Sequence, residues 1–170
     1  EDWAAGANAS VNVVDATGNG ITTSNVAVPA ITSATYTAST GALVVTGSGF
    51  LKASGATNDI DASKFTFTGE GGATYTLTDS ADVEITFGTA FTITLSSTDK
   101  TAVNLLLNKD GTASTDATTY NLAAAEDWAA GADTAVTVAD LTSNGITATI
   151  SVSSSGGGGT GGGSTSTATT

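Results

Sequence analysis

The sequence predicts an all-β fold, an antiparallel β-sandwich with one or two short helices inserted. Short runs rich in Thr, Val, Ile and aromatic residues fill most of the 170 residues, and Gly, Asn and Asp separate them. Several runs alternate apolar residues with Thr, which is the pattern of a strand with one buried face. Many such strands at short spacing, with turn residues between them, are typical of a sandwich.

Nine runs are predicted as strands, beginning with "ITSATYT". In several of them Thr takes every second position, on the face that is expected to meet solvent. The predicted strands cover residues 31–37, 42–47, 64–69, 73–78, 83–86, 91–96, 118–123, 135–140 and 145–152.

The stretch "SSTDKTAVNLLLNKDG" has a helical pattern and predicts a helix over 97–109. Ser97 is the expected N-cap, and Asp99 in the first turn suits the positive end of the helix dipole. Gly111 suits the position after the helix end. The apolar stripe that we expect to be buried consists of Ala102, Val103, Leu106 and Leu107.

A second, shorter helical turn is predicted over 122–132, because "LAAAEDWAAGA" is rich in Ala and reaches Gly131 near its end. It would carry Trp128, which we expect to fill the core at one end of the sandwich.

The heptapeptide "EDWAAGA" occurs twice, at residues 1–7 and 126–132, which are 125 positions apart. The match continues at the same offset between residues 11–22 and 136–147. One shared offset over such a length indicates an internal repeat. A unit of this length buries enough surface to fold without disulfides or metals.

The repeat and the only proline, Pro29, divide the chain. Residues 29–153 are predicted to form one domain, which opens at Pro29 and ends with the second copy. Residues 1–28 are then the closing strands of a preceding repeat, or a strand donated to a neighbouring subunit. Residues 154–170 are expected to be a flexible Gly/Ser/Thr-rich tail or linker. Neighbouring repeats or identical subunits are the expected partners.

Composition excludes several classes of function. The net charge is −12 and the four basic residues are all lysines, so the chain cannot neutralise nucleic-acid phosphates, and the charge disfavours anionic lipid. The sequence contains no long apolar run that would span a membrane. It also has no His and no Cys, which removes catalytic triads, thiol chemistry and disulfides. We therefore expect no enzymatic activity.

The acidic chain is compatible with calcium, and Asp59 and Asp61 are the first candidates. Their spacing matches the start of an EF-hand loop, but Lys64 occupies the position where that loop needs Gly. A turn in which Asn58, Asp59 and Asp61 cap backbone groups is therefore favoured. Calcium in a loop of another kind stays open as the alternative.

Glu126 and Asp127 are the second pair of candidates. They favour the start of a short helix, and the alternative is that they bind calcium where one repeat meets the next. The motif Asp-x-Thr-x-Asn-Gly at 140–145 also allows two interpretations, a turn or a calcium site. A hairpin turn at Asn144 is favoured over calcium, because no downstream Glu completes a shell.

The segment "PAITSATYTASTGALVVTGSGF" (29–50) resembles the first hairpin of bacterial immunoglobulin-like repeats. Residues 58–77 and 123–133 look like repeats in very large extracellular proteins of environmental bacteria. The resemblance covers about residues 29–153 and the partial first copy. It implies an immunoglobulin-like sandwich and a structural role outside the cell or on its surface, in adhesins, biofilm matrix or surface filaments. Many such proteins are stiffened by calcium.

Two functions follow as hypotheses. The first is a structural module of an extracellular array or filament, and the repeat favours it. The second is a binding module that recognises a glycan or a partner protein through the sandwich loops. Aromatic residues make up only 6% of the chain, which favours the first, because sugar sites usually expose Trp or Tyr.

Overall fold

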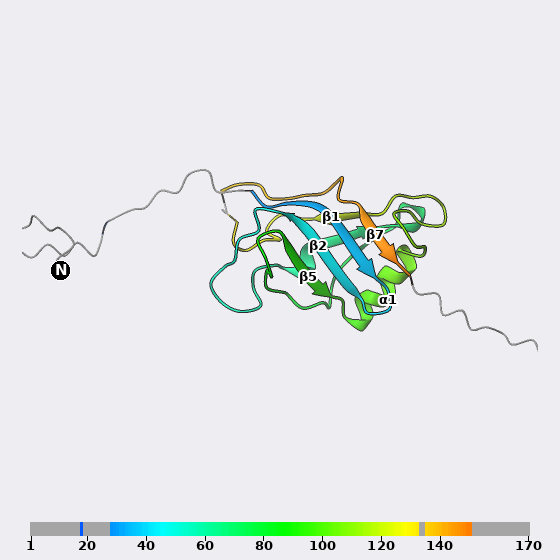
Figure 1. Cartoon of the computed structure of the whole chain (residues 1–170), viewed down its shortest axis with the longest axis horizontal. Coiled ribbons are helices and arrows are strands. Elements are labelled where there is room, and N and C mark those ends of the chain that lie inside the picture. The colour runs from blue at the N-terminus through cyan, green and yellow to red at the C-terminus, as the bar shows by residue number, and fades with distance from the viewer. Residues whose placement is uncertain (1–17, 19–27, 133–134, 151–170) are drawn as a thin grey trace, which may run out of the picture.

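The computed structural model describes residues 18, 28–132 and 135–150 (Figure 1). In this part of the chain, seven strands form two sheets, accompanied by one α-helix and two short 3-10 helices. The β-rich class with an inserted helix is confirmed. The predicted closing strands before Val28, apart from Gly18, and the predicted tail at 154–170 lie outside the described residues.

The first sheet has four strands in the order β5-β2-β1-β7. Strand β1 (Ala30–Thr37) forms an antiparallel hairpin with β2 (Ala42–Ser48), which pairs with β5 (Ala90–Thr94). Strand β7 (Ile146–Thr149) lies parallel to β1, with Thr37 opposite Thr149. Because β1 and β7 run in the same direction, β1 begins at one end of the sheet and β7 ends at the other (Figure 1).

The second sheet has three strands in the order β4-β3-β6. Its strands are β3 (Phe65–Thr68), β4 (Thr74–Thr76) and β6 (Asn121–Ala124), all antiparallel. The 3-10 helices η1 (Ala62–Lys64) and η2 (Glu70–Gly72) lie on either side of β3.

Both sheets contribute side chains to one buried core, as the alternating pattern predicts. In β5, Phe91 and Ile93 are buried while the threonines between and after them are exposed. Aromatic rings connect the two sheets: Phe65 of β3 lies 5.8 Å from Phe91, and Tyr36 of β1 lies 6.2 Å from Phe67. Such ring contacts add to the free energy gained by burying apolar surface.

The helix α1 (Ser97–Leu106) begins at the predicted residue, but its N-cap lies one residue earlier than predicted. Ser96, rather than Ser97, is the N-cap, and its side chain accepts a hydrogen bond from the Asp99 backbone N–H at 3.1 Å. The reason is the spacing Ser-x-x-Asp, which places the hydroxyl and the third helical residue together. No helix in the described residues is long and apolar enough to cross a membrane.

The C-terminal end of α1 also differs from the prediction. The helix stops at Leu106 with Leu107 as its C-cap, so Gly111 does not follow the helix end. Val103 and Leu107 are buried, but Leu106 is only partly buried. The buried stripe is therefore narrower than the sequence indicated.

Three further predictions of secondary structure were wrong. The helical turn predicted over 122–132 does not form. Residues 121–124 form β6, in part as the strand predicted over 118–123, because pairing with β3 overrides the helical preference of Ala. Residues 83–86 and 135–140 make only isolated bridges, at Val83 and Asp140. In both, carboxylates take up backbone N–H groups that a neighbouring strand would otherwise accept: Ile85 donates to Asp59, and Val138 donates to Glu126.

Candidate functional site

The second copy of the repeat, predicted as residues 126–153, follows β6 and contains β7. We call its residues 126–150 the closing segment. It contains two of the four predicted metal ligands and most of the residues that the two copies share. Its contacts therefore show what the shared residues do.

Trp128 anchors the closing segment in the core, as predicted. Its side chain is fully buried, and its ring lies 5.6 Å from Phe50, 5.8 Å from Phe65 and 6.0 Å from Phe91. Its indole Nε1 donates a hydrogen bond of 2.7 Å to the carbonyl oxygen of Val138. One side chain thus joins both sheets to the later part of the closing segment.

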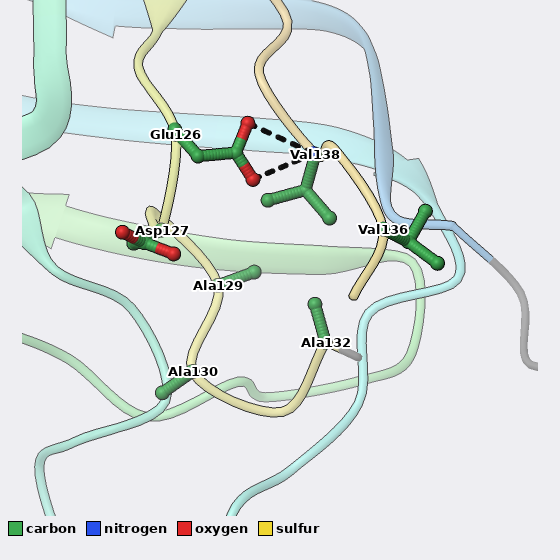
Figure 2. Close-up of a pocket in the computed structure, with 7 residues that line it drawn as sticks. All are labelled: Glu126, Asp127, Ala129, Ala130, Ala132, Val136 and Val138. Atoms are coloured by element: carbon green, nitrogen blue, oxygen red, sulfur yellow. Dashed lines mark hydrogen bonds between the residues drawn. The ribbon is translucent and has the colours of Figure 1, made fainter. Parts of the chain in front are cut away.

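Glu126, which is partly exposed, joins the first residues of the closing segment to Val138 and Ala139. Its two carboxylate oxygens accept hydrogen bonds from the Val138 N–H at 2.9 and 3.1 Å (Figure 2). One of them also accepts from the Ala139 N–H at 3.0 Å. The neighbouring Asp127 carboxylate is exposed and points in another direction. Asp127 has a φ of +64°, a conformation that Asp adopts more readily than most residues.

A small pocket of about 60 Å³ lies beside these two acids (Figure 2). The remaining lining residues are Ala129, Ala130, Ala132, Val136 and Val138. Water molecules fit this volume, but sites that bury a small organic ligand usually measure about 300–1,000 Å³. The pocket is therefore too small for a sugar ring.

Close backbone packing explains the glycine of the shared heptapeptide. A Cβ atom at Gly131 would lie 2.1 Å from the carbonyl oxygen of Leu51, a distance that no side chain can occupy. Because Gly131 has no side chain, the backbone of the closing segment can pack directly against the backbone at Leu51.

Asp140 and Asn144 attach the start of β7 to both sheets. The Asp140 carboxylate accepts a hydrogen bond of 2.8 Å from the Ile31 N–H of β1 and one of 2.9 Å from the Asn144 side-chain amide. That amide also donates to the Leu122 carbonyl of β6 at 3.0 Å. The segment is no hairpin, since 135–140 is not a strand, but Asn144 serves as a donor within the fold.

Asp59 and Asp61 cap backbone groups, which was the favoured interpretation. Asp59 is fully buried and accepts hydrogen bonds from the N–H groups of Ala53 at 2.6 Å and Ile85 at 2.8 Å. Asp61 is the N-cap of η1 and accepts a hydrogen bond of 2.9 Å from the Ser63 N–H.

The fold brings the two predicted pairs of acids onto adjacent segments. The Asp61 N–H donates to the Trp128 carbonyl at 3.1 Å, and the Ala130 N–H donates to the Asp59 carbonyl at 2.9 Å. Three of the four carboxylates nevertheless point at different backbone donors. Within 28–132 and 135–150, no group of three or more acidic side chains is placed to hold a metal ion. Calcium at Asp59, Asp61, Glu126 and Asp127 stays a prediction.

Thermal unfolding with calcium and with a chelator tests this prediction. Free calcium at about ten times its Kd would add about 1.4 kcal/mol to the free energy of unfolding, provided that only the folded chain binds it. Removal of Asp127 by Asp127→Asn is the informative control, since its exposed carboxylate can change without disturbing the core. Melting curves that superimpose with and without calcium would contradict the prediction.

Sequence reasoning missed the most heavily bonded carboxylate, Asp99. It is fully buried at the first turn of α1. Six hydrogen bonds reach it, from the backbone N–H groups of Thr78, Asp79 and Ser80 and from the hydroxyls of Tyr75, Thr78 and Ser80. The Ser-x-x-Asp spacing signalled a helix start, but nothing local indicated a contact some twenty positions away.

These bonds determine the charge state of Asp99. Burial by itself opposes ionisation, but the hydrogen bonds from Ser80, Thr78, Tyr75 and Asp79 outweigh it and hold the pKa of the carboxyl well below its usual range. Asp99 is therefore a buried anion that fixes the 78–80 loop to α1.

Two other acids organise the loops near the end of α1. The side chain of Asn108 donates to Glu70 at 2.9 Å and lowers its pKa, and the Ser114 hydroxyl donates to Asp116 and lowers its pKa. The Asp116 N–H in turn donates to Glu70 at 3.3 Å. Many acids of this chain thus serve as acceptors for local backbone and side-chain donors.

Comparisons with protein-family models, with curated proteins and with solved structures gave no match. The described residues define a β-rich fold of two sheets with one α-helix, which ends in a segment whose sequence occurs twice in the chain.

Proposed function

We propose that residues 29–153 form one structural module of a bacterial extracellular or cell-surface protein. Modules of this kind, joined in series, would build a stiff array or filament used in adhesion or in a biofilm matrix. The observation that carries the proposal is the parallel pairing of β1 with β7, which places the start and the end of the domain at opposite ends (Figure 1). Such a domain extends an array by its full length.

The strand order supports an immunoglobulin-like sandwich. Strands β1, β2 and β5 are neighbours in one sheet, as A, B and E are in that fold, while β3 and β6 are neighbours in the other, as C and F are. The ring contacts between β3 and β5, and between β1 and β3, support face-to-face packing of the sheets.

The same pairing suits the domain to bear tension. A pull on both ends of the domain moves β1 and β7 in opposite directions along their axes. Backbone hydrogen bonds at both ends of the pair, Ala34 to Gly145 at 2.9 Å and Ala38 to Thr149 at 3.0 Å, are then loaded together rather than in succession. Breaking them at once requires more force than breaking them singly.

The alternative, recognition of a glycan through the loops, has less support. Of the aromatic residues in the described part of the chain, only Phe87 is strongly exposed, at 69%. Sugar rings usually stack on such exposed aromatic faces, so a single one provides a small surface. A structural module requires none.

Single-molecule stretching tests the proposal, and the cysteine-free chain allows unique attachment points. With Val28→Cys and Ser153→Cys as handles, the pull shears β1 against β7. With Ser39→Cys, in the turn after β1, and Ser153→Cys, the pull acts at one end and separates the pair bond by bond. We expect a clearly higher unfolding force for the first geometry.

Both variants keep the same core and the same C-terminal handle, so they differ only in the direction of loading. Equal unfolding forces in the two geometries would mean that the β1–β7 pair does not bear the load. The proposed mechanical role would then be wrong.

A further inference from the structure

We propose that residues 1–28 are the closing segment of a second unit, and that they dock on that unit where residues 126–150 lie in this one. The partner is another copy of the same repeat. The proposal rests on the proposed function, because it assumes units joined in series, and it adds the surface through which they join. We call residues 30–125 the body of the unit.

The first copy carries the same residue at nearly every position through which the closing segment contacts the body or holds itself together, with Ala148 as an exception. Trp3 stands for Trp128, which fills the cluster of Phe50, Phe65 and Phe91. The other contact positions with identical residues are Glu1 for Glu126, Gly6 for Gly131, Val13 for Val138, Asp15 for Asp140, Asn19 for Asn144 and Ile21 for Ile146.

Between residues 136 and 147, the two copies differ only at exposed positions. These positions are Thr137, Ala139, Leu141 and Ser143, which correspond to Asn12, Val14, Ala16 and Gly18. The residues that are buried in this part of the second copy are thus the same in the first copy. This is expected if residues 1–28 also pack against a body.

The backbone of the first copy agrees at the one position that the structure describes. Gly18 has a φ of +75°, and Ser143, at the same place in the second copy, has a φ of +70°. This left-handed conformation is uncommon for a residue other than Gly, so the first copy has at this position the residue that adopts it without strain.

In this unit the place of the closing segment is taken by residues 126–150, and chain length prevents residues 1–28 from filling it completely. In the place of β7, Ser24 would lie opposite Thr37, at the far end of β1, while the chain must return to Ala30 at the near end. That distance is about 23 Å along the strand, whereas the six links from Ser24 to Ala30 span at most about 22 Å without any turn. Complete docking as far as Ser24 is therefore possible only on another unit.

The match weakens after Thr22. Ala148 is buried in β7 beside Tyr36, and the first copy has the larger, polar Thr23 at this position. Docking of residues 1–28 on another copy of this body therefore requires some repacking where Thr23 takes the place of Ala148.

The full chain with Trp128→Ala tests the docking. This substitution weakens the unit's own closing segment, so residues 1–28 of a second molecule, which carry Trp3, can compete for its place. We expect association that increases with protein concentration in sedimentation experiments, together with a blue shift of the fluorescence of Trp3, then the only Trp in the chain. The double variant Trp3→Ala/Trp128→Ala is the control and should stay monomeric.

Association that persists in the double variant, or a folded Trp128→Ala chain that stays monomeric at all concentrations, would overturn the proposal. Neither outcome affects the stretching experiment, which uses an intact closing segment and tests the load-bearing role separately.

A second variant decides the question if Trp128→Ala does not fold. In the full chain, it gives residues 126–147 the sequence of residues 1–22. The seven substitutions are Asp133→Asn, Thr134→Ala, Ala135→Ser, Thr137→Asn, Ala139→Val, Leu141→Ala and Ser143→Gly. We expect a cooperative transition with a melting temperature within about 5 °C of the original. Adding Ala148→Thr should lower it further. Loss of cooperative unfolding in the seven-residue graft would show that the first copy cannot close this body.

Discussion

Replacement of Trp128 by alanine is expected to lower the free energy of unfolding by about 3–5 kcal/mol. The indole is fully buried among three phenylalanine rings and holds the Val138 carbonyl at 2.7 Å. Its removal leaves a large cavity where the two sheets and the closing segment meet. Urea unfolding at low protein concentration measures the loss without a contribution from docking between molecules.

The chain itself provides the matched control. Trp3 lies in the same heptapeptide, "EDWAAGA", so Trp3→Ala makes the same chemical change in the same local sequence. If residues 1–28 serve another unit, this change should alter the free energy of unfolding by less than about 0.5 kcal/mol, as surface substitutions do. Equal losses for the two variants would mean that both tryptophans support the same core.

Substitution of Asp99 by asparagine is expected to lower the free energy of unfolding by about 3 kcal/mol at neutral pH. Asparagine has nearly the same shape, but its amide group would face N–H donors of the 78–80 loop that now donate to a carboxylate. The six hydrogen bonds would no longer have a charged acceptor, and the donors that face the new amide nitrogen would have no acceptor. Chemical unfolding of both chains measures the difference.

The effect should depend on pH in one direction. Because the pKa of Asp99 is lowered in the folded chain, the unfolded chain takes up the proton first as the pH falls. The stabilisation by Asp99 is therefore complete above the unfolded pKa of about 3.9 and is lost below it, toward the lower pKa of the folded state. The original chain should lose stability more steeply with acid than Asp99→Asn.

Asp79→Asn is the control for this prediction, since it removes a charge from the same loop at an exposed side chain. We expect it to change the free energy of unfolding by less than about 0.5 kcal/mol. A similar small loss for Asp99→Asn, or parallel acid profiles of the two chains, would contradict the role of Asp99 as a buried anion.

Alternation of apolar residues with Thr was sufficient to predict the long strands. The hairpin of β1 and β2 lies within a residue of the predicted 31–37 and 42–47. Here each inward side chain is apolar and each turn residue tolerates its conformation, so local preference and tertiary packing agree. The segments 83–86 and 135–140 were also predicted as strands but form only isolated bridges, because Asp59 and Glu126 accept backbone N–H groups from them.

The candidate site was predicted in part for the same reason. The capping role of Asp61 depends on neighbours two residues away and was visible in the sequence. Asp99 binds a loop about twenty residues before it, and Glu126 binds residues twelve and thirteen positions after it. Their sequence neighbourhoods contain no sign of these partners.

The sequence by itself determined the β-rich class, the buried positions of the long strands and the repeat of 125 residues, since each depends on residue types at fixed spacing. Only the tertiary structure decided that β7 lies parallel to β1, that Trp128 joins the two sheets and that Asp99 is buried. These features depend on which distant segments meet, and that is decided by the packing of the whole core rather than by any local pattern.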